Sequence, residues 1–195
     1  MSTAPLHPPA PITPKDLLMM PDGDRYELVD GELVERNMGF LSSVYASRLG
    51  RWLGEHCEAN RLGWVADAEA GYQCFPDSPN KVRKPDVSFI SGKRLSAQEA
   101  PQGWCPLAPD LAVEVVSPND VMEQVFEKVY EYLGAGVRLV WVLIPSAVTV
   151  LVMRKEGGGA ILRAGDVLDG EDVVPGFRCS VDDLFRPPPG TEPSG

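Results

Sequence analysis

Hydrophobic and polar residues follow regular spacings in several separate segments, and each spacing predicts one element of secondary structure. Residues 26–35 alternate on either side of an Asp-Gly pair, which is a strong signal for a β-hairpin. Over residues 40–59 apolar side chains recur every three or four positions, which predicts a long amphipathic helix. Thr13 followed by Pro14 is typical of the start of a further, shorter helix.

An apolar segment in the second half of the chain predicts a buried strand. Residues 111–116 read Leu-Ala-Val-Glu-Val-Val and end at turn-forming residues, as in a strand that is covered on both faces. Asn119 or Asp120 is expected to cap a helix that runs to about Leu133, and residues 138–144 form another apolar strand. Strand, helix and strand in succession make a βαβ unit, which has parallel strands and a right-handed connection.

These elements, with shorter strands expected over 86–90 and 148–153, indicate an α/β domain at the border with α+β. We expect a central mixed β-sheet flanked by helices. The 195 residues suffice for one domain with a substantial core, which we expect to span residues 13–186. Residues 1–12, rich in proline and alanine, predict a flexible lead-in, and residues 187–195 predict a flexible Pro/Gly tail.

Composition narrows the classes of function. The formal net charge of −10 argues against a broad, non-specific polyanion binder, although a local basic groove stays compatible with it. The four cysteines are scattered and form no CxxC pair, which fits neither a zinc site nor a disulfide framework. No apolar stretch approaches the ~18 residues of a membrane span, and the N-terminus lacks the pattern of a signal peptide. A cytoplasmic protein without membrane contact is expected.

Glu114 is the first candidate functional residue, because it interrupts the apolar segment 111–116. An unpaired ionised carboxylate buried there costs several kcal/mol, so it must be protonated, paired or bound to a metal. Asp86 begins the preceding strand, and two carboxylates on adjacent strands can jointly hold a hard cation such as Mg²⁺. Lys128, on the following helix, is suited to orient a nucleophilic water or to stabilise charge on a phosphate.

Each of these residues also has a purely structural alternative. Glu114 could form a buried ion pair with Lys128. Asp86 could cap a loop or pair with the basic residues just before it. Lys128 could contact acidic neighbours on its own helix. Glu32, in the hairpin, is a weaker fourth candidate, and we interpret it as an exposed residue beside the turn.

Four segments of the chain resemble one family of proteins. They read YELVDGELVE, KPDVSFI, LAVEVVSPND and EKVYEYLGAGVRLVWVLIP, and with their connections they cover roughly residues 13–185. Each segment alone is a weak signal, but the four in this order are similar to the Uma-two family of restriction-endonuclease-like proteins. That family is part of the PD-(D/E)XK nuclease superfamily. The resemblance implies a restriction-endonuclease-like fold.

The resemblance also implies the roles of individual residues. Asp86 and Glu114 would be metal ligands, together with the backbone carbonyl of Val115. The superfamily usually carries a lysine two residues after the second acid, where this chain has Val116. Lys128 matches a displaced position of that lysine on the following helix, from which it can reach the same point.

A second departure lies near the start of the long helix, where many relatives carry a histidine and this chain has Ser42 and Ser43.

We expect a Mg²⁺-dependent endonuclease that hydrolyses DNA phosphodiester bonds, with Mn²⁺ as a substitute, and a homodimer is plausible. The main alternative is a catalytically inert binding or assembly module that keeps the nuclease fold. A nuclease that acts on RNA is a third interpretation.

Overall fold

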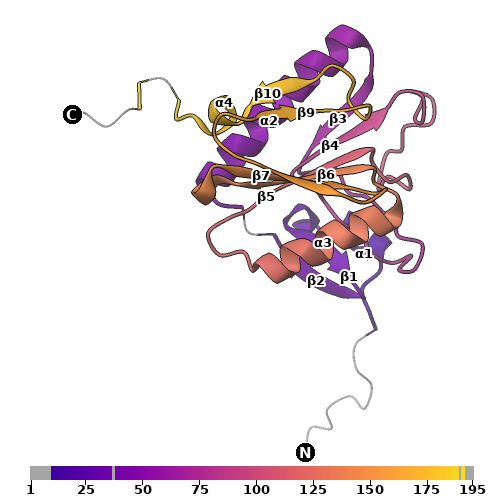
Figure 1. Ribbon diagram of the computed structural model, residues 1–195. Helices are drawn as coiled ribbons and strands as arrows, with labels where there is room; N and C mark the ends of the chain where they lie inside the picture. Colours follow the sequence, from indigo (N-terminus) through magenta and orange to yellow (C-terminus); the bar gives the residue numbers. More distant parts are fainter. Residues whose placement is uncertain (1–9, 37, 189, 192–195) are drawn as a thin grey trace, which may run out of the picture.

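The structure is a computed structural model that describes residues 10–36, 38–188 and 190–191 (Figure 1). Most of the expected lead-in and part of the expected tail lie outside these residues. A central sheet of six strands runs in the order β3-β4-β5-β6-β7-β8. These strands are β3 (Gly63–Asp67), β4 (Val87–Ser91), β5 (Leu111–Val115), β6 (Leu139–Ile144), β7 (Thr149–Arg154) and β8 (Gly159–Leu162).

The sheet is mixed, as the sequence predicts. Strands β5 and β6 are parallel, and every other neighbouring pair is antiparallel. The helix α3 (Met122–Ala135) connects the parallel pair and completes the expected βαβ unit. The short helix η2 (Pro145–Ala147) turns the chain from β6 into β7.

Helices cover both faces of the sheet (Figure 1). One face packs against α2 (Phe40–Asn60), α4 (Val181–Phe185) and the hairpin of β9 (Val167–Asp169) and β10 (Arg178–Ser180). The other face packs against α3. Successive strand residues point to opposite faces, so Trp141 joins the first core and Val142 the second. Burial on both sides explains why all five residues of β5 are buried and nearly all are apolar.

The N-terminal part forms a smaller layer beside α3 (Figure 1). It consists of α1 (Pro14–Met19), η1 (Gly23–Arg25) and the two-stranded hairpin of β1 (Tyr26–Val29) and β2 (Glu32–Glu35). Leu28 and Val82 exchange two backbone hydrogen bonds of 3.0 and 2.9 Å, which fasten the hairpin to the segment ahead of β4. Asp30 and Gly31 both have positive φ angles, as a tight hairpin turn requires.

Most predicted elements are confirmed, and Thr13 is the N-cap of α1, the short helix that it was expected to begin. The predicted N-cap of α3 is wrong. Val121 occupies that position, and Asp120 instead accepts a 2.7 Å hydrogen bond from the backbone N–H of Ser117. The carboxylate of Asp120 therefore closes the loop after β5, because the N–H of Ser117 competes with the helix for it.

All four cysteines are free. In the described part of the chain, no helix is both long and apolar enough to cross a bilayer.

Candidate active site

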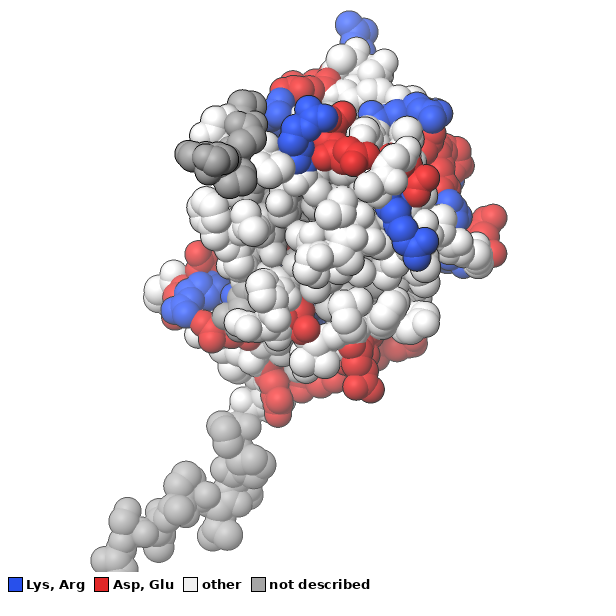
Figure 2. Space-filling view, turned by 60° about the vertical axis from the view of Figure 1, so that its left-hand side comes forward, with Lys and Arg blue, Asp and Glu red and all other residues white. Residues whose placement is uncertain are grey.

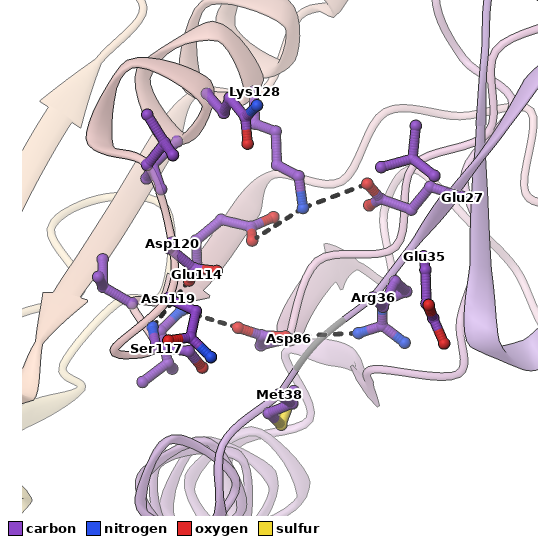
Figure 3. Close-up of a pocket in the computed structure, with 16 residues that line it drawn as sticks. Glu27, Glu35, Arg36, Met38, Asp86, Glu114, Ser117, Asn119, Asp120 and Lys128 are labelled. Atoms are coloured by element: carbon purple, nitrogen blue, oxygen red, sulfur yellow. Dashed lines mark hydrogen bonds and ion pairs between the residues drawn. The ribbon is translucent and has the colours of Figure 1, made fainter.

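A pocket of about 200 Å³ opens at the carboxyl end of β5, between α3, the β1–β2 hairpin and the segment leading into α2 (Figure 3). Its position follows from the sheet. Because β4 is antiparallel to β5, the start of β4 lies beside the end of β5, and the pairing of Val87 with Val113 puts Asp86 level with Glu114. The charged residues that line the pocket are Glu27, Glu35, Arg36, Asp86, Glu114, Asp120 and Lys128.

Asp86 is buried at the inner wall of this pocket. Its Oδ2 accepts a 2.8 Å hydrogen bond from the backbone N–H of Val115, and its Oδ1 lies 3.4 Å from the guanidinium of Arg36. Burial, reinforced by the negative charge of Glu114, raises the pKa of Asp86 to about 7. The hydrogen bond and the guanidinium offset this only in part.

Glu114 lies next to Asp86 and is also buried. The hydroxyl of Tyr132 on α3 donates a 2.7 Å hydrogen bond to its Oε1, and the ammonium of Lys128 lies 3.5 Å from its Oε2. Burial raises the pKa of Glu114 despite the nearby ammonium. Burial is the main cause of both shifts, so the two adjacent carboxyl groups lie where ionisation is unfavourable.

Lys128 bridges two acids across the pocket, as Figure 3 shows. Its Nζ lies 3.2 Å from Glu27 Oε2 and 3.5 Å from Glu114 Oε2. Burial alone would lower the pKa of Lys128, but the charges of the two acids outweigh burial and raise the pKa. The side chain is therefore a fixed cation at neutral pH and is suited to stabilise negative charge rather than to accept a proton.

Glu27 is a pocket residue that the sequence analysis did not identify as a candidate. It is fully buried, and it accepts hydrogen bonds of 2.9 Å from Arg83 and 2.8 Å from the backbone N–H of Lys84. Burial would raise its pKa, but Lys128 and Arg83 outweigh burial and lower the pKa. In a short alternating hairpin, Glu27 could as well face solvent, and only the docking of the hairpin beside α3 buries it. Glu32, the hairpin acid considered from the sequence, is exposed and lies outside the pocket lining.

The structural alternatives have separate outcomes. Asp86 does not pair with Lys84, whose Nζ donates to the backbone carbonyls of Gly23 and Asp24 at 2.9 and 3.1 Å. Its neighbouring cation is Arg36, which the sequence analysis did not identify. The Glu114–Lys128 ion pair is present, within a three-membered group that includes Glu27.

The donor set of the pocket fits a hard divalent cation. Asp86 and Glu114 supply carboxylate oxygens. The carbonyl of Val115 points to the side of β5 that faces Asp86, because the N–H and C=O of one strand residue share a side and this N–H donates to Asp86. Mg²⁺ typically takes one or two carboxylates and keeps several waters. Within the described ranges, no group of three or more His, Cys, Asp or Glu residues is arranged to hold a metal, so any cation here would depend on this smaller set.

Titration of Asp86 predicts a specific pH dependence of stability in the absence of metal. The folded pKa of about 7 exceeds the ordinary value of 3.8, so between these pH values the folded state binds more protons than the unfolded state. In EDTA, the free energy of unfolding should therefore fall as pH rises from about 4 to 7. The Asp86→Asn variant should lack this contribution and become the more stable protein at pH 8. Thermal unfolding of both proteins across pH measures the effect, and parallel pH profiles would contradict the prediction.

Comparisons with known proteins identify the family and the fold of the chain. The sequence model of the Uma2 family, described as "Putative restriction endonuclease", matches residues 14–182. A crystal structure described as "a putative nuclease belonging to DUF820" from Anabaena variabilis has 19% sequence identity and a TM-score of 0.77, and the match covers 90% of this chain and 98% of that one. At this identity the likeness establishes the fold. No curated protein matches the chain. Because the family match covers most of its length, the chain belongs to the Uma2 family and has the restriction-endonuclease-like fold that its motifs imply.

Proposed function

We propose that this protein is an endonuclease that uses Mg²⁺, with Mn²⁺ as a substitute, to hydrolyse DNA phosphodiester bonds. The observation that carries the proposal is the pair of buried acids, Asp86 and Glu114, whose pKa values are raised beside the fixed cation Lys128. Without a divalent cation, this arrangement destabilises the ionised pair. Membership of a nuclease family and the nuclease fold support the same conclusion.

In this proposal Asp86, Glu114 and the carbonyl of Val115 hold the cation. When bound, the cation supplies an acidic water and neutralises charge on the scissile phosphate. Tyr132 holds Oε1 of Glu114, which leaves Oε2 directed toward the pocket and Lys128. These contacts hold Glu114 within β5 and Asp86 at the residue that immediately precedes β4.

Two cations of the chain would act on the phosphate. Lys128 is held by Glu27 and Glu114 and can donate a hydrogen bond to the attacking water or to a phosphate oxygen. Arg36 donates 2.9 Å to the carbonyl of Ala68 and contacts Asp86 only at 3.4 Å. Its remaining N–H groups suit a second phosphate oxygen, since a guanidinium matches the geometry of phosphate.

Nicking of supercoiled plasmid DNA tests the proposal. The purified protein should convert the plasmid to the open-circular form with Mg²⁺ or Mn²⁺ and not with EDTA. Asp86→Ala should abolish this activity because it removes one of the two carboxylates. Glu32→Gln is the matched control, since it changes an exposed acid of the hairpin outside the pocket. Nicking that survives Asp86→Ala would contradict the proposed site.

A second candidate function is a catalytically inert binding or assembly module, which the net charge of −10 favours. Calorimetric titration with Mg²⁺ or Mn²⁺ separates the endonuclease from the inert module, because the inert module would bind neither cation.

The four free cysteines fit the reducing cytoplasm, where we propose that the protein acts. Light scattering tests the homodimer expected from the family.

A further inference from the structure

The mouth of the pocket is bordered by exposed apolar side chains. Three of them, Val34, Met38 and Val121, line the pocket itself. Phe40 and Leu41 follow Met38 in the first turn of α2, with 82% and 57% of their surfaces exposed. We call these five residues the apolar rim. Exposed apolar residues that gather in one part of a surface, rather than singly, mark a candidate interaction site.

The part of the rim that Phe40 and Leu41 form is fixed to the site rather than merely near it. The backbone N–H of Gly39 donates 3.0 Å to Ser117 Oγ, and Ser42 Oγ donates 3.2 Å to the carbonyl of Val116. Ser117 also donates 3.0 Å to Ser42. Val116 and Ser117 directly follow the strand that carries Glu114. The first turn of α2 is therefore held against the loop that borders the proposed metal ligands.

Charge distribution argues against a duplex as the molecule that contacts this rim. A DNA duplex exposes phosphates and keeps its bases stacked inside, so proteins bind it with lysine and arginine placed along the backbone. None of the five rim residues is charged. The face drawn in Figure 2 has a broad, largely uncharged centre, and most of its Lys, Arg, Asp and Glu residues lie nearer the margins. Among the charged residues that line the pocket, only Arg36 and Lys128 are cations.

Unpaired bases have the complementary chemistry. They present apolar faces that stack on aromatic side chains, and this stacking contributes much of the affinity of proteins for single strands. Val34 and Met38 line the pocket that holds Asp86 and Glu114, and Phe40 lies two residues after Met38. Nucleotides next to a phosphate bound in the pocket are therefore within reach of this part of the rim. One phosphate can then be met by Arg36 and Lys128 without a basic track along the surface.

We propose that the substrate is DNA with unpaired bases at the cleavage point, and that Phe40 stacks on a base next to the scissile phosphate. This inference rests on the proposed nuclease function and specifies its substrate class. Phe40 is a binding residue in this scheme, and it takes no part in the chemical step.

Steady-state cleavage of one labelled oligonucleotide, single-stranded or annealed to its complement, tests the inference with Mg²⁺ and with Mn²⁺. The single strand should be cut with a kcat/KM at least about tenfold higher than the duplex. Phe40→Ala should raise KM for the single strand about tenfold, the loss expected for one stacked base, and leave kcat nearly unchanged. Phe40→Trp should keep the low KM, because it retains a stacking surface.

Tyr130→Ala is the matched control, since Tyr130 is an exposed aromatic residue on α3 outside the pocket lining. It should leave KM unchanged. Equal or better cleavage of the duplex, or a Phe40→Ala variant with the KM of the parent protein, would overturn the inference while leaving the nuclease function intact.

If neither substrate is cut, the proposed function fails, and fluorescence anisotropy with the same oligonucleotides then decides the role of the rim. Tighter binding of the single strand that Phe40→Ala weakens would support the inference, and any other result would overturn it. Light scattering on the same variants tests whether a second copy of the chain, rather than DNA, binds the apolar rim. A dimer that Phe40→Ala dissociates, with no change in affinity for the single strand, would assign the rim to self-association and overturn the inference.

Discussion

Replacing Glu114 by glutamine is expected to reduce metal-dependent nicking of plasmid DNA by at least about 100-fold. The substitution removes one carboxylate charge and keeps the shape of the side chain. Tyr132 can still donate its hydrogen bond to the amide oxygen, and Lys128 keeps its contact with Glu27. The variant should therefore fold, so that a loss of activity reports on the site rather than on the structure.

The same variant should lose its response to divalent cations. In the parent protein, added Mg²⁺ should raise the unfolding temperature, because a ligand that binds only the folded state stabilises it. Glu114→Gln should abolish that rise while leaving the unfolding temperature in EDTA at or above that of the parent, since burial disfavours the ionised carboxylate it replaces. Glu123→Gln serves as the control, because Glu123 is an exposed acid in the first turn of α3, the helix that carries Lys128, and lies outside the pocket lining. A Glu114→Gln variant that nicks DNA at the parental rate would exclude Glu114 from the site.

Replacing Glu27 by alanine is expected to have the largest effect on stability, a loss of about 3–5 kcal/mol in the free energy of unfolding. Glu27 is fully buried and serves three donors. Its removal leaves the guanidinium of Arg83 with one acid fewer and the backbone N–H of Lys84 without its acceptor. Lys128 loses the nearer of its two acids. Buried charges and donors that lose their partners account for the predicted cost.

Urea denaturation of the Glu27→Ala variant measures this loss. Glu35→Ala is the matched control in the same hairpin, because Glu35 is about half exposed and pairs with the exposed Arg25. Its substitution should change the free energy of unfolding by no more than about 0.5 kcal/mol. Equal midpoints for the two variants would contradict the role assigned to the buried charge group.

The elements that the sequence predicted well are those whose signals are local. The Asp-Gly hairpin and the strand–helix–strand unit that carries Glu114 and Lys128 depend on spacing within short segments. Glu114 could be identified because an acid inside an apolar strand is costly wherever that strand lies. Asp86 and Lys128 were identified together with it, through motif positions, although their catalytic roles stay predictions.

Arg36 and Glu27 could not be found in this way, because their surroundings come from contacts between distant segments. Glu27 meets Arg83 and Lys128 only when the hairpin docks beside α3, and Arg36 meets Asp86 across 50 positions of sequence. The wrong prediction of the N-cap of α3 arose instead from competition between two local contacts. Asp120 had two local acceptor roles available, and the turn after β5 prevailed over the helix cap.

The antiparallel pairing of β4 with β5 has a consequence for how sequences with this architecture can diverge. Asp86 and Glu114 are level because Val87 faces Val113, so deleting one residue inside either strand would turn one acid to the opposite side of the sheet. The long connection between the two strands, residues 92–110, carries no such constraint. Natural variants should therefore accumulate insertions and deletions in that connection and almost none between Asp86 and Ser91 or between Leu111 and Val115.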